Sequence, residues 1–255
     1  MTRTLEEKKR VLELWSEGYN KLQIANETNI PRGTVSDCIK QFADVVSLEE
    51  HYYQERLSNA SFYVQDATRP HVQKEYVYLL GLYLGDGTVS KIPKTYKLRV
   101  FLDGRYPNII NGCAQAMQPV LPENKIGILP QKGNYVTVQC HSNDLIDLFP
   151  QYGNGRKHNR QIVLMAWQQA IVDKYPLEFF RGLYHSDGSR FSSIVKGKDY
   201  PKYQFTNMSE DIRQMFVHAS ELLGLHWTTK TSKRDIMISR REDVAYLDSV
   251  IGPKN

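Results

Sequence analysis

The sequence predicts an α+β protein, with two tandem αββαββα repeats preceded by a small all-α helix-turn-helix domain. The segment EYVYLLGLYLGDGTVS at 75–90 aligns without gaps with PLEFFRGLYHSDGSRF at 176–191. The same order of strand-like and helix-like patterns follows each copy, as expected for an internal repeat. Residues 4–42 show three successive helical patterns instead. We expect the two repeats to form a pseudo-twofold saddle of antiparallel sheets.

The first domain begins with a helix over 4–17, where apolar residues recur at helical spacing until Gly18 ends the helix. A second short helix is predicted over 21–28. A third follows over 31–42, because Pro31 is tolerated near a helix start, where its missing N–H costs little.

The last two of these helices resemble a helix-turn-helix. Asn29 occupies the tight turn, where φ is positive and Gly is usual, and Asn is the next-best residue there. Ile24 and Val35 are expected to pack inside. The side chains predicted to face the major groove of DNA are Arg32, Thr34, Ser36 and Lys40. A helical module that docks onto another protein is the alternative.

Residues 43–70 carry five acidic residues and two arginines. Such a segment cannot itself bind phosphates well, so it predicts a partly helical connector. The predicted domain limits are 1–42 for the helix-turn-helix, 43–70 for the acidic connector, 71–155 for repeat 1, 156–175 for a linker with its own helix around 162–173, and 176–255 for repeat 2.

Each repeat is predicted to continue beyond its first helix with two strands, a long helix, two strands and a shorter helix. In repeat 1 these elements are 88–92, 96–103, 106–121, 125–131, 135–141 and 143–152. In repeat 2 they are 189–196, 200–207, 210–225, 226–233, 235–240 and 242–251.

The nonamers LLGLYLGDG at 79–87 and FRGLYHSDG at 180–188 resemble the motif of the LAGLIDADG homing endonucleases. The resemblance covers essentially all of 75–255, because the order of elements after each motif is also that of the family. It implies a single-chain, two-motif enzyme that cuts both strands of DNA at a specific site. The metals would be held by the aspartate that ends each motif.

Those aspartates are Asp86 and Asp187. Each motif helix carries two small residues four apart, Gly81 with Gly85 and Gly182 with Ser186, so the helices can approach closely and bring the carboxylates together. Adjacent carboxylates repel unless a cation neutralises them. Oxygen-only ligands, including the carbonyls of Gly85 and Ser186 at the helix ends, favour Mg²⁺, for which Mn²⁺ can substitute.

Further site residues come from matched positions of the repeats. GNGRKHN and the terminal GPKN align on Lys157 and Lys254, which we expect to stabilise phosphorane charge or polarise water, or else simply to bind phosphate. Asp103 and Asn207, at the ends of second strands, are candidates for ordering water, or turn residues. We interpret His185 as a histidine of the helix interface rather than a general base.

DNA is expected to lie across the saddle, where alternate residues of a strand point to one face. The predicted contacts on the strands are Lys97 and Arg99, Gln131, Thr137 and Gln139, Arg190, Lys202 and Gln204, and Lys230, Lys233 and Arg234. The lysines expected to touch phosphates at the hairpin turns are Lys91, Lys94, Lys196 and Lys198.

Composition agrees with nucleic-acid binding. The net charge is −2 over 1–70 and +7 over 71–255. The three cysteines show no CxxC pairing, which argues against a disulfide framework or a zinc site. No apolar stretch approaches the length of a membrane span, and we expect an intracellular, cytoplasmic monomer.

Two other functions fit the same scaffold. A non-cleaving DNA-binding transcriptional regulator can combine a degenerate LAGLIDADG scaffold with a helix-turn-helix, although both acidic residues persist here. An intron maturase would bind intron RNA instead of cutting duplex DNA, and no residue excludes it.

Overall fold

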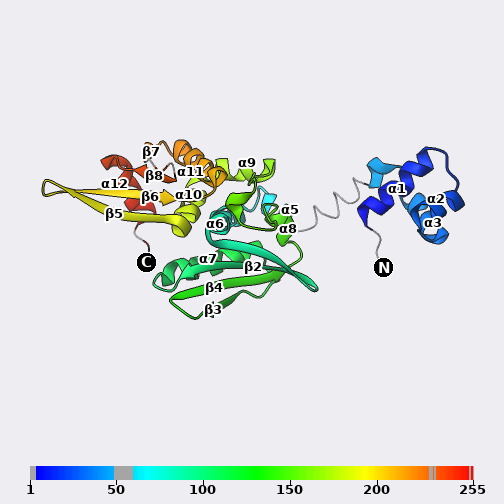
Figure 1. Ribbon diagram of the computed structural model, residues 1–255, viewed down its shortest axis with the longest axis horizontal. Coiled ribbons are helices and arrows are strands. Elements are labelled where there is room, and N and C mark those ends of the chain that lie inside the picture. Colours follow the sequence, from blue (N-terminus) through cyan, green and yellow to red (C-terminus); the bar gives the residue numbers. More distant parts are fainter. Residues whose placement is uncertain (1–3, 49–59, 230–231, 233, 253, 255) are drawn as a thin grey trace. The chain divides into compact units, whose positions relative to one another are not determined.

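The computed structural model describes residues 4–48, 60–229, 232, 234–252 and 254. The chain forms two compact units, Met1–Phe62 and Tyr63–Asn255, and each is described by itself (Figure 1). The predicted connector, 43–70, is divided between them. No described helix has the length and apolar character needed to cross a membrane.

The first unit contains the three predicted helices, which are α1 (Leu5–Ser16), α2 (Lys21–Thr28) and α3 (Arg32–Gln41). α1 begins with a capping box in which Thr4 and Glu7 exchange hydrogen bonds. Asn29 ends α2 with φ 55°, the left-handed conformation that the sequence predicts for this turn. Ile24 and Val35 are fully buried between the helices, as expected.

The second unit contains both αββαββα repeats. Repeat 1 consists of α6 (Pro70–Asp86), β1 (Gly87–Ile92), β2 (Thr95–Asp103), α7 (Pro107–Val120), β3 (Gly127–Pro130), β4 (Tyr135–Ser142) and α8 (Leu145–Leu148). Repeat 2 consists of α10 (Pro176–Asp187), β5 (Gly188–Val195), β6 (Lys198–Thr206), α11 (Glu210–Leu222), β7 (Trp227–Thr229), β8 (Asp235–Ile238) and α12 (Arg241–Val250). The predicted order of elements is confirmed, and the largest difference is α8, which is much shorter than expected.

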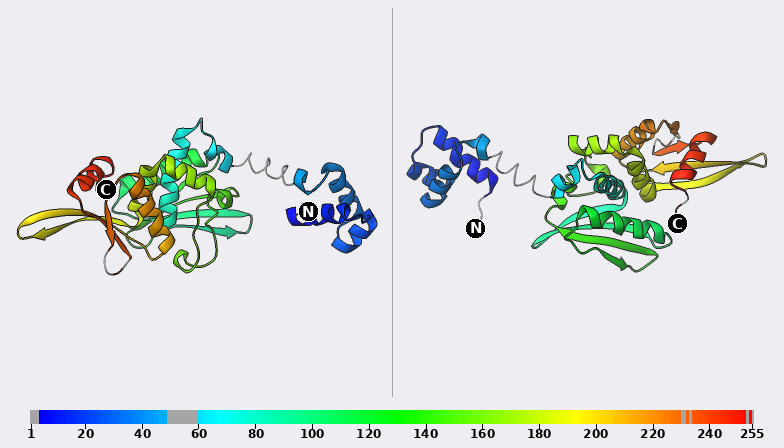
Figure 2. Two further views of the ribbon diagram at one scale, coloured as in Figure 1. Left: turned by 90° about the horizontal axis from the view of Figure 1, so that it is seen from above. Right: turned by 180° about the vertical axis from the view of Figure 1, so that it is seen from behind.

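The two sheets have the same antiparallel topology. Strands run in the order β1-β2-β4-β3 in sheet A and β5-β6-β8-β7 in sheet B. Two views of the ribbon show the sheets as separate layers, with the helices of each repeat packed on one side (Figure 2). The predicted fold class is therefore confirmed.

The motif helices α6 and α10 pack side by side between the two sheets (Figure 1). Their small residues are needed for this approach. A Cβ added at Gly81 would lie 2.7 Å from the backbone nitrogen of Leu183, and one at Gly182 would overlap the carbonyl oxygen of Tyr78. Backbone atoms cannot move aside cheaply, so larger residues at these positions would separate the helices.

Each sheet buries one face against helices. In β2, Leu98, Val100 and Leu102 are buried. Alternation places Lys97, Arg99, Phe101 and Asp103 on the opposite face, which we call the open face of sheet A. In sheet B, buried Tyr203 and Phe205 likewise leave Lys202, Gln204 and Thr206 on the open face.

The linker between the repeats contains α9 (Ala166–Lys174), which packs against α6, α10 and α11. Its Gln168 is fully buried. The Nε2 atom of Gln168 donates to the Tyr76 hydroxyl at 2.6 Å, while its Oε1 accepts from the Nε2 of Gln151 at 2.6 Å. Because buried polar groups are costly when unpaired, this network fixes the linker helix to α6.

Candidate active site

Asp86 and Asp187 are the last residues of α6 and α10, and each is followed by a glycine that begins a strand. Gly87 and Gly188 have extended backbones, with φ −94° and −89°. The glycines are needed for packing: a Cβ at Gly87 would lie 2.5 Å from Tyr83 Cα, and one at Gly188 would lie 2.5 Å from the Tyr184 carbonyl oxygen. The Asp-Gly pair thus turns the chain from helix to strand within one residue.

The two carboxyl groups are half-buried and affect each other electrostatically. Burial, and then the neighbouring Asp187 carboxylate, raise the pKa of Asp86 to about 7. Burial also raises the pKa of Asp187, but a hydrogen bond from Asn207 Nδ2 at 2.7 Å to its Oδ2 opposes this effect. A cation placed between such groups would remove both penalties.

Lys157 and Lys254 reach the ends of the two motif helices in a matched way. Lys157 Nζ donates to the carbonyl oxygens of Gly87 at 2.7 Å and of Gly85 at 3.5 Å. Lys254 Nζ donates to that of Ser186 at 3.0 Å. Burial lowers the pKa of Lys157 to about 7 and that of Lys254 to about 8, against the opposing effect of the aspartates.

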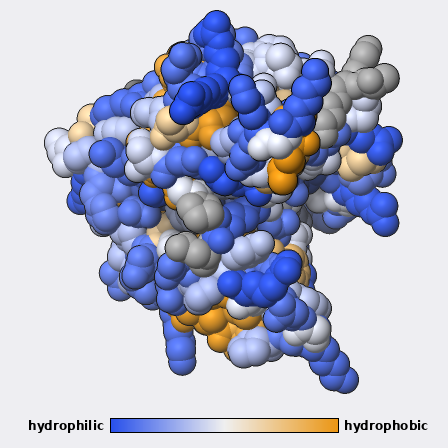
Figure 3. Space-filling model, turned by 90° about the vertical axis from the view of Figure 1, so that its left-hand side faces the viewer, coloured by the Kyte–Doolittle hydropathy of each residue, from blue (hydrophilic) through white to orange (hydrophobic). Residues whose placement is uncertain are grey.

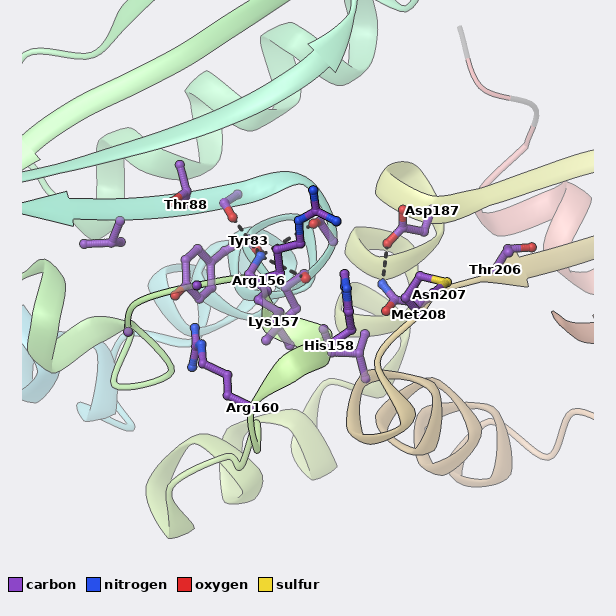
Figure 4. Close-up of a pocket in the computed structure, with 17 residues that line it drawn as sticks. Tyr83, Thr88, Arg156, Lys157, His158, Arg160, Asp187, Thr206, Asn207 and Met208 are labelled. Carbon is purple, nitrogen blue, oxygen red and sulfur yellow. Dashed lines mark hydrogen bonds between the residues drawn. The ribbon is translucent and has the colours of Figure 1, made fainter. Parts of the chain in front are cut away.

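A cavity of about 420 Å³ opens on one side of the helix pair (Figure 4). Its lining includes Asp187, Asn207, Lys157 and Gly85. In the close-up Asn207 points at Asp187, while Lys157 approaches the end of α6. The cavity therefore combines the aspartate of repeat 2 with a helix-end residue of repeat 1 and a lysine that directly follows repeat 1.

A second cavity, of about 160 Å³, has the reciprocal composition. Its lining includes Asp86, Asp103, Ser186 and Lys254. Here the aspartate comes from repeat 1, and the helix-end residue and the lysine come from repeat 2. The two half-sites thus exchange the contributions of the two repeats, which is consistent with a pseudo-twofold relation between the repeats.

The donor set fits a hard divalent cation. Each half-site offers the carboxylate of one motif-helix aspartate, and the smaller one also contains Asp103; the residue that precedes the other motif-helix aspartate lines the same cavity. Among the described residues there is no cluster of three or more His, Cys, Asp and Glu side chains. Mg²⁺ is commonly held by one or two carboxylates and several waters, so this sparse set of oxygen atoms is sufficient.

Asp103 and Asn207 are not equivalent, in contrast to the expectation from the sequence. Gly87 pairs with Val100 and Gly188 with Phe205, so the strand register aligns Asn207 with Leu102 instead. Asn207 hydrogen-bonds to Asp187. Asp103 forms an ion pair with Arg105 at 2.6 Å, and this neighbour holds the pKa of its carboxyl group well below the ordinary value.

His185 lies at the helix interface. Its Nδ1 is 2.9 Å from the hydroxyl of Tyr78, which belongs to α6. Burial, together with Arg181 and Lys254, lowers the pKa of His185 to about 3. The imidazole is therefore neutral at physiological pH and connects the two motif helices.

Several predicted DNA contacts lie on the open faces or hairpin turns. On sheet A they are Lys97, Arg99 and Gln139, with Lys91 and Lys94 at the turn and Gln131 exposed beyond β3. On sheet B they are Lys202 and Gln204, with Lys196 and Lys198 at the turn and Arg234 exposed before β8. Gln204 donates to Asp235 and Thr206, each at 2.9 Å, so its amide is already engaged. Lys230 and Lys233 lie outside the described residues.

Two predicted sheet contacts, Arg190 and Thr137, are paired with or covered by other residues of the chain. Arg190 pairs with Tyr203, so it points away from the open face, where its guanidinium forms an ion pair with Asp248 at 2.6 Å. Thr137 lies on the open face but is only 2% exposed, because it stands between larger neighbours. Arg190 is therefore engaged in an ion pair on the other side of the sheet, and Thr137 is covered by its neighbours.

In the first unit, the predicted groove-facing side chains Arg32, Thr34 and Lys40 are exposed. Ser36 is half-buried, and its hydroxyl accepts a hydrogen bond from Lys21 Nζ at 3.0 Å. Ser36 is therefore engaged within the unit.

Several polar residues of the larger cavity were not anticipated, and three of them lie close to Lys157 or to the start of β1. They are Thr88, Arg156 and His158. Arg156 and His158 flank Lys157 and are exposed. The basic run in GNGRKHN was the available signal, but only its lysine has a counterpart in repeat 2.

The chain is similar in structure to solved homing endonucleases. Mesophilic variants of the homing endonuclease I-DmoI align at 18% identity with a TM-score of 0.49, over 71% of this chain and 96% of that chain. A complex of I-DmoI with DNA and Mn aligns at 18% identity with a TM-score of 0.49, over 72% of this chain and 99% of that chain. The homing endonuclease I-WcaI bound to its DNA recognition sequence aligns at 12% identity with a TM-score of 0.45, over 71% of this chain and 82% of that chain.

The sequence matches no protein-family model and no curated protein.

Proposed function

We propose that this protein is a LAGLIDADG-type endonuclease that cuts both strands of duplex DNA at a specific site with a divalent metal, Mg²⁺ or Mn²⁺. The reciprocal composition of the two half-sites supports this proposal most directly. Each holds one motif-helix aspartate, one lysine and the helix-end residue of the other repeat. Both reactive centres are complete within one chain, so a monomer suffices.

In this proposal each residue of the two half-sites has a distinct role. Asp86 and Asp187 would hold the metal, which when bound would supply activation of a water and stabilisation of the leaving oxygen of the phosphodiester. Asn207 orients the Asp187 carboxylate through its amide. The ammonium groups of Lys157 and Lys254 stabilise the charge that develops on the phosphorus-bound oxygens, or polarise the attacking water.

A selection from a random duplex library, with and without Mg²⁺, tests the proposal, because it reports the target and the cleavage together. We expect linear product from a plasmid that carries the selected site, only when the metal is present. Asp86→Asn and Asp187→Asn should each abolish double-strand cleavage while leaving the protein folded. Unchanged cleavage by both variants would refute this mechanism.

A non-cleaving DNA-binding regulator is the second candidate, favoured by one observation. The carbonyl oxygens at the motif-helix ends accept hydrogen bonds from lysine ammonium groups, which are themselves cations. A site neutralised in this way has less need of a metal. Tight, sequence-specific binding with no nicking in Mg²⁺ or Mn²⁺ would identify the regulator.

The first unit is proposed to lengthen the recognition site. Its third helix exposes Arg32, Thr34 and Lys40 on its surface, as a groove-reading helix requires. Footprinting of the full chain and of an Arg32→Ala, Lys40→Ala variant would show whether protection shortens at one end of the site.

A further inference from the structure

An apolar row crosses the open face of sheet A. Phe101 of β2 pairs with Thr137 of β4, and Thr137 pairs with Leu129 of β3. Residues directly opposite each other on neighbouring strands point to the same face. Phe101 is 37% exposed and Leu129 is 42% exposed, whereas Thr137 between them is 2% exposed. The two large side chains thus enclose the threonine and leave an apolar strip, the Phe101–Leu129 row, facing solvent.

Basic and polar groups border this row. Arg99 and Gln139 form the next pair along β2 and β4, followed by Lys97 and His141. The guanidinium carbon of Arg99 is 5.6 Å from the centre of the Phe101 ring. Among the described residues the buried Nε of Arg99 has no hydrogen-bond partner. The open face therefore offers cations and an apolar strip within two strand pairs of each other.

Figure 3 shows one face of the molecule, where most of the surface is hydrophilic and apolar side chains gather in small patches. One patch lies low on that face, at the height of sheet A and α7 in Figure 1. Small apolar areas among charges are unlike the broad apolar cores of permanent protein interfaces.

The charges beside the row identify its occupant. An apolar protein partner would have to remove water from Arg99 and Lys97 without replacing it. The major groove of duplex DNA supplies phosphates and base edges for the cations, and thymine adds a C5-methyl group for apolar contact. The major groove therefore offers partners both for the cations and for the apolar row.

Among the described residues, repeat 2 has no counterpart of Phe101 in this row. The pairing of Gly87 with Val100 and of Gly188 with Phe205 aligns Phe101 with Thr206. Thr206 pairs with Asp235, and its hydroxyl donates to that carboxylate at 2.7 Å. A feature that the fold itself required would recur at this position. Within the part of the chain that the structure describes, the apolar row is therefore found in repeat 1 only.

We infer that the Phe101–Leu129 row reads the C5-methyl group of thymine in the half of the target bound by sheet A, which makes the recognition site asymmetric. This inference rests on the proposed binding of duplex DNA. It requires no cleavage.

The test replaces thymine by deoxyuridine, which differs only by the missing methyl group. A target is first selected from a random duplex library without metal, and each thymine is then replaced singly. We expect one or two positions in one half-site to weaken binding about fourfold each, the effect of uncovering one methyl group. The other half-site should show no such position.

Variants connect that effect to the row. In Phe101→Ser and Leu129→Ser, thymine and deoxyuridine duplexes should bind equally at the sensitive position. Ile128→Ser is the matched control, because Ile128 is 45% exposed on the same strand but faces the other side of the sheet. This variant should keep the fourfold difference. Circular dichroism checks that each variant is folded.

The possible failures are distinguishable. If no duplex is selected, the proposed function fails, and the inference fails with it. If a duplex is selected but no deoxyuridine weakens binding, or if Phe101→Ser keeps the difference, only the inference is overturned. It is also overturned if the chain forms a dimer that Leu129→Ser dissociates, because the row would then bind a second copy.

Discussion

Replacing Asp86 by Asn should stabilise the metal-free protein at about pH 8, because the carboxylate is held in an unfavourable place for charge. Burial, and then Asp187, raise the pKa of Asp86 from 3.8 to about 7. A carboxyl group whose pKa is raised on folding contributes stability below its unfolded pKa. That contribution is lost as the pH rises through about 7.

The size of the effect follows from the shift. A rise of about three pKa units corresponds to about 4 kcal/mol of folding free energy at a pH above both values. We expect about half of this to be recovered, because the Asn amide also loses water on burial. A gain of about 2 kcal/mol should raise the melting temperature of a domain of this size by about 4 to 8 °C.

The assay is thermal unfolding of the second unit, followed by circular dichroism in the presence of a chelator. At about pH 3, below the unfolded pKa of 3.8, the Asp86 carboxyl group is protonated in both the folded and the unfolded state, so wild type and Asp86→Asn should melt close together. Saturating Mg²⁺ should raise the melting temperature of the wild type and so reduce the difference in melting temperature between wild type and Asp86→Asn. Asp199→Asn, at an exposed position of β6, is the control and should change little. An Asp86→Asn melting temperature equal to or below that of wild type at about pH 8 would refute the reasoning.

The remaining predictions address the lysines, the helix contact and the turn. Lys157→Met and Lys254→Met should each slow cleavage of one strand by about a hundredfold, so that supercoiled plasmid accumulates as nicked circles, and strand-specific labels should show opposite strands. Gly182→Ala should destabilise the second unit by about 2 to 4 kcal/mol in thermal unfolding, because its Cβ would strike backbone of α6. Gly33→Ala, with open space around it, should not destabilise the protein. Asn29→Val should destabilise the first unit by about 1 to 2 kcal/mol, since φ is 55°, while Asn29→Gly should be neutral.

Much of the site was visible in the sequence because the repeat supplies a second copy of each key residue. The two Asp-Gly segments predict the ends of the motif helices, and the alignment on Lys157 and Lys254 predicts that both lysines reach those ends. The structure places both Nζ atoms within hydrogen-bonding distance of the helix-end carbonyls. Small residues four apart predicted the close packing of α6 and α10.

The face of the sheet toward which a strand residue points was harder to predict, for a geometric reason. Alternation determines which residues of a strand share a face, but pairing decides which set faces the helices. Arg190 was therefore assigned to the wrong side of β5. Asp103 and Asn207 occupy similar positions in the sequence, yet the register separates them by one residue.

The sequence by itself determined the order of elements, the small residues of the helix contact and the aspartates that end both helices, since all of these depend on local pattern and on repetition. Only the tertiary structure decided how the half-sites are composed and which open-face side chains are accessible. Each cavity joins residues from both repeats, and Thr137 is buried by neighbours from β2 and β3. The burial and the electrostatic environment of these side chains depend on contacts between segments that are distant in the sequence. A local sequence pattern therefore cannot predict them.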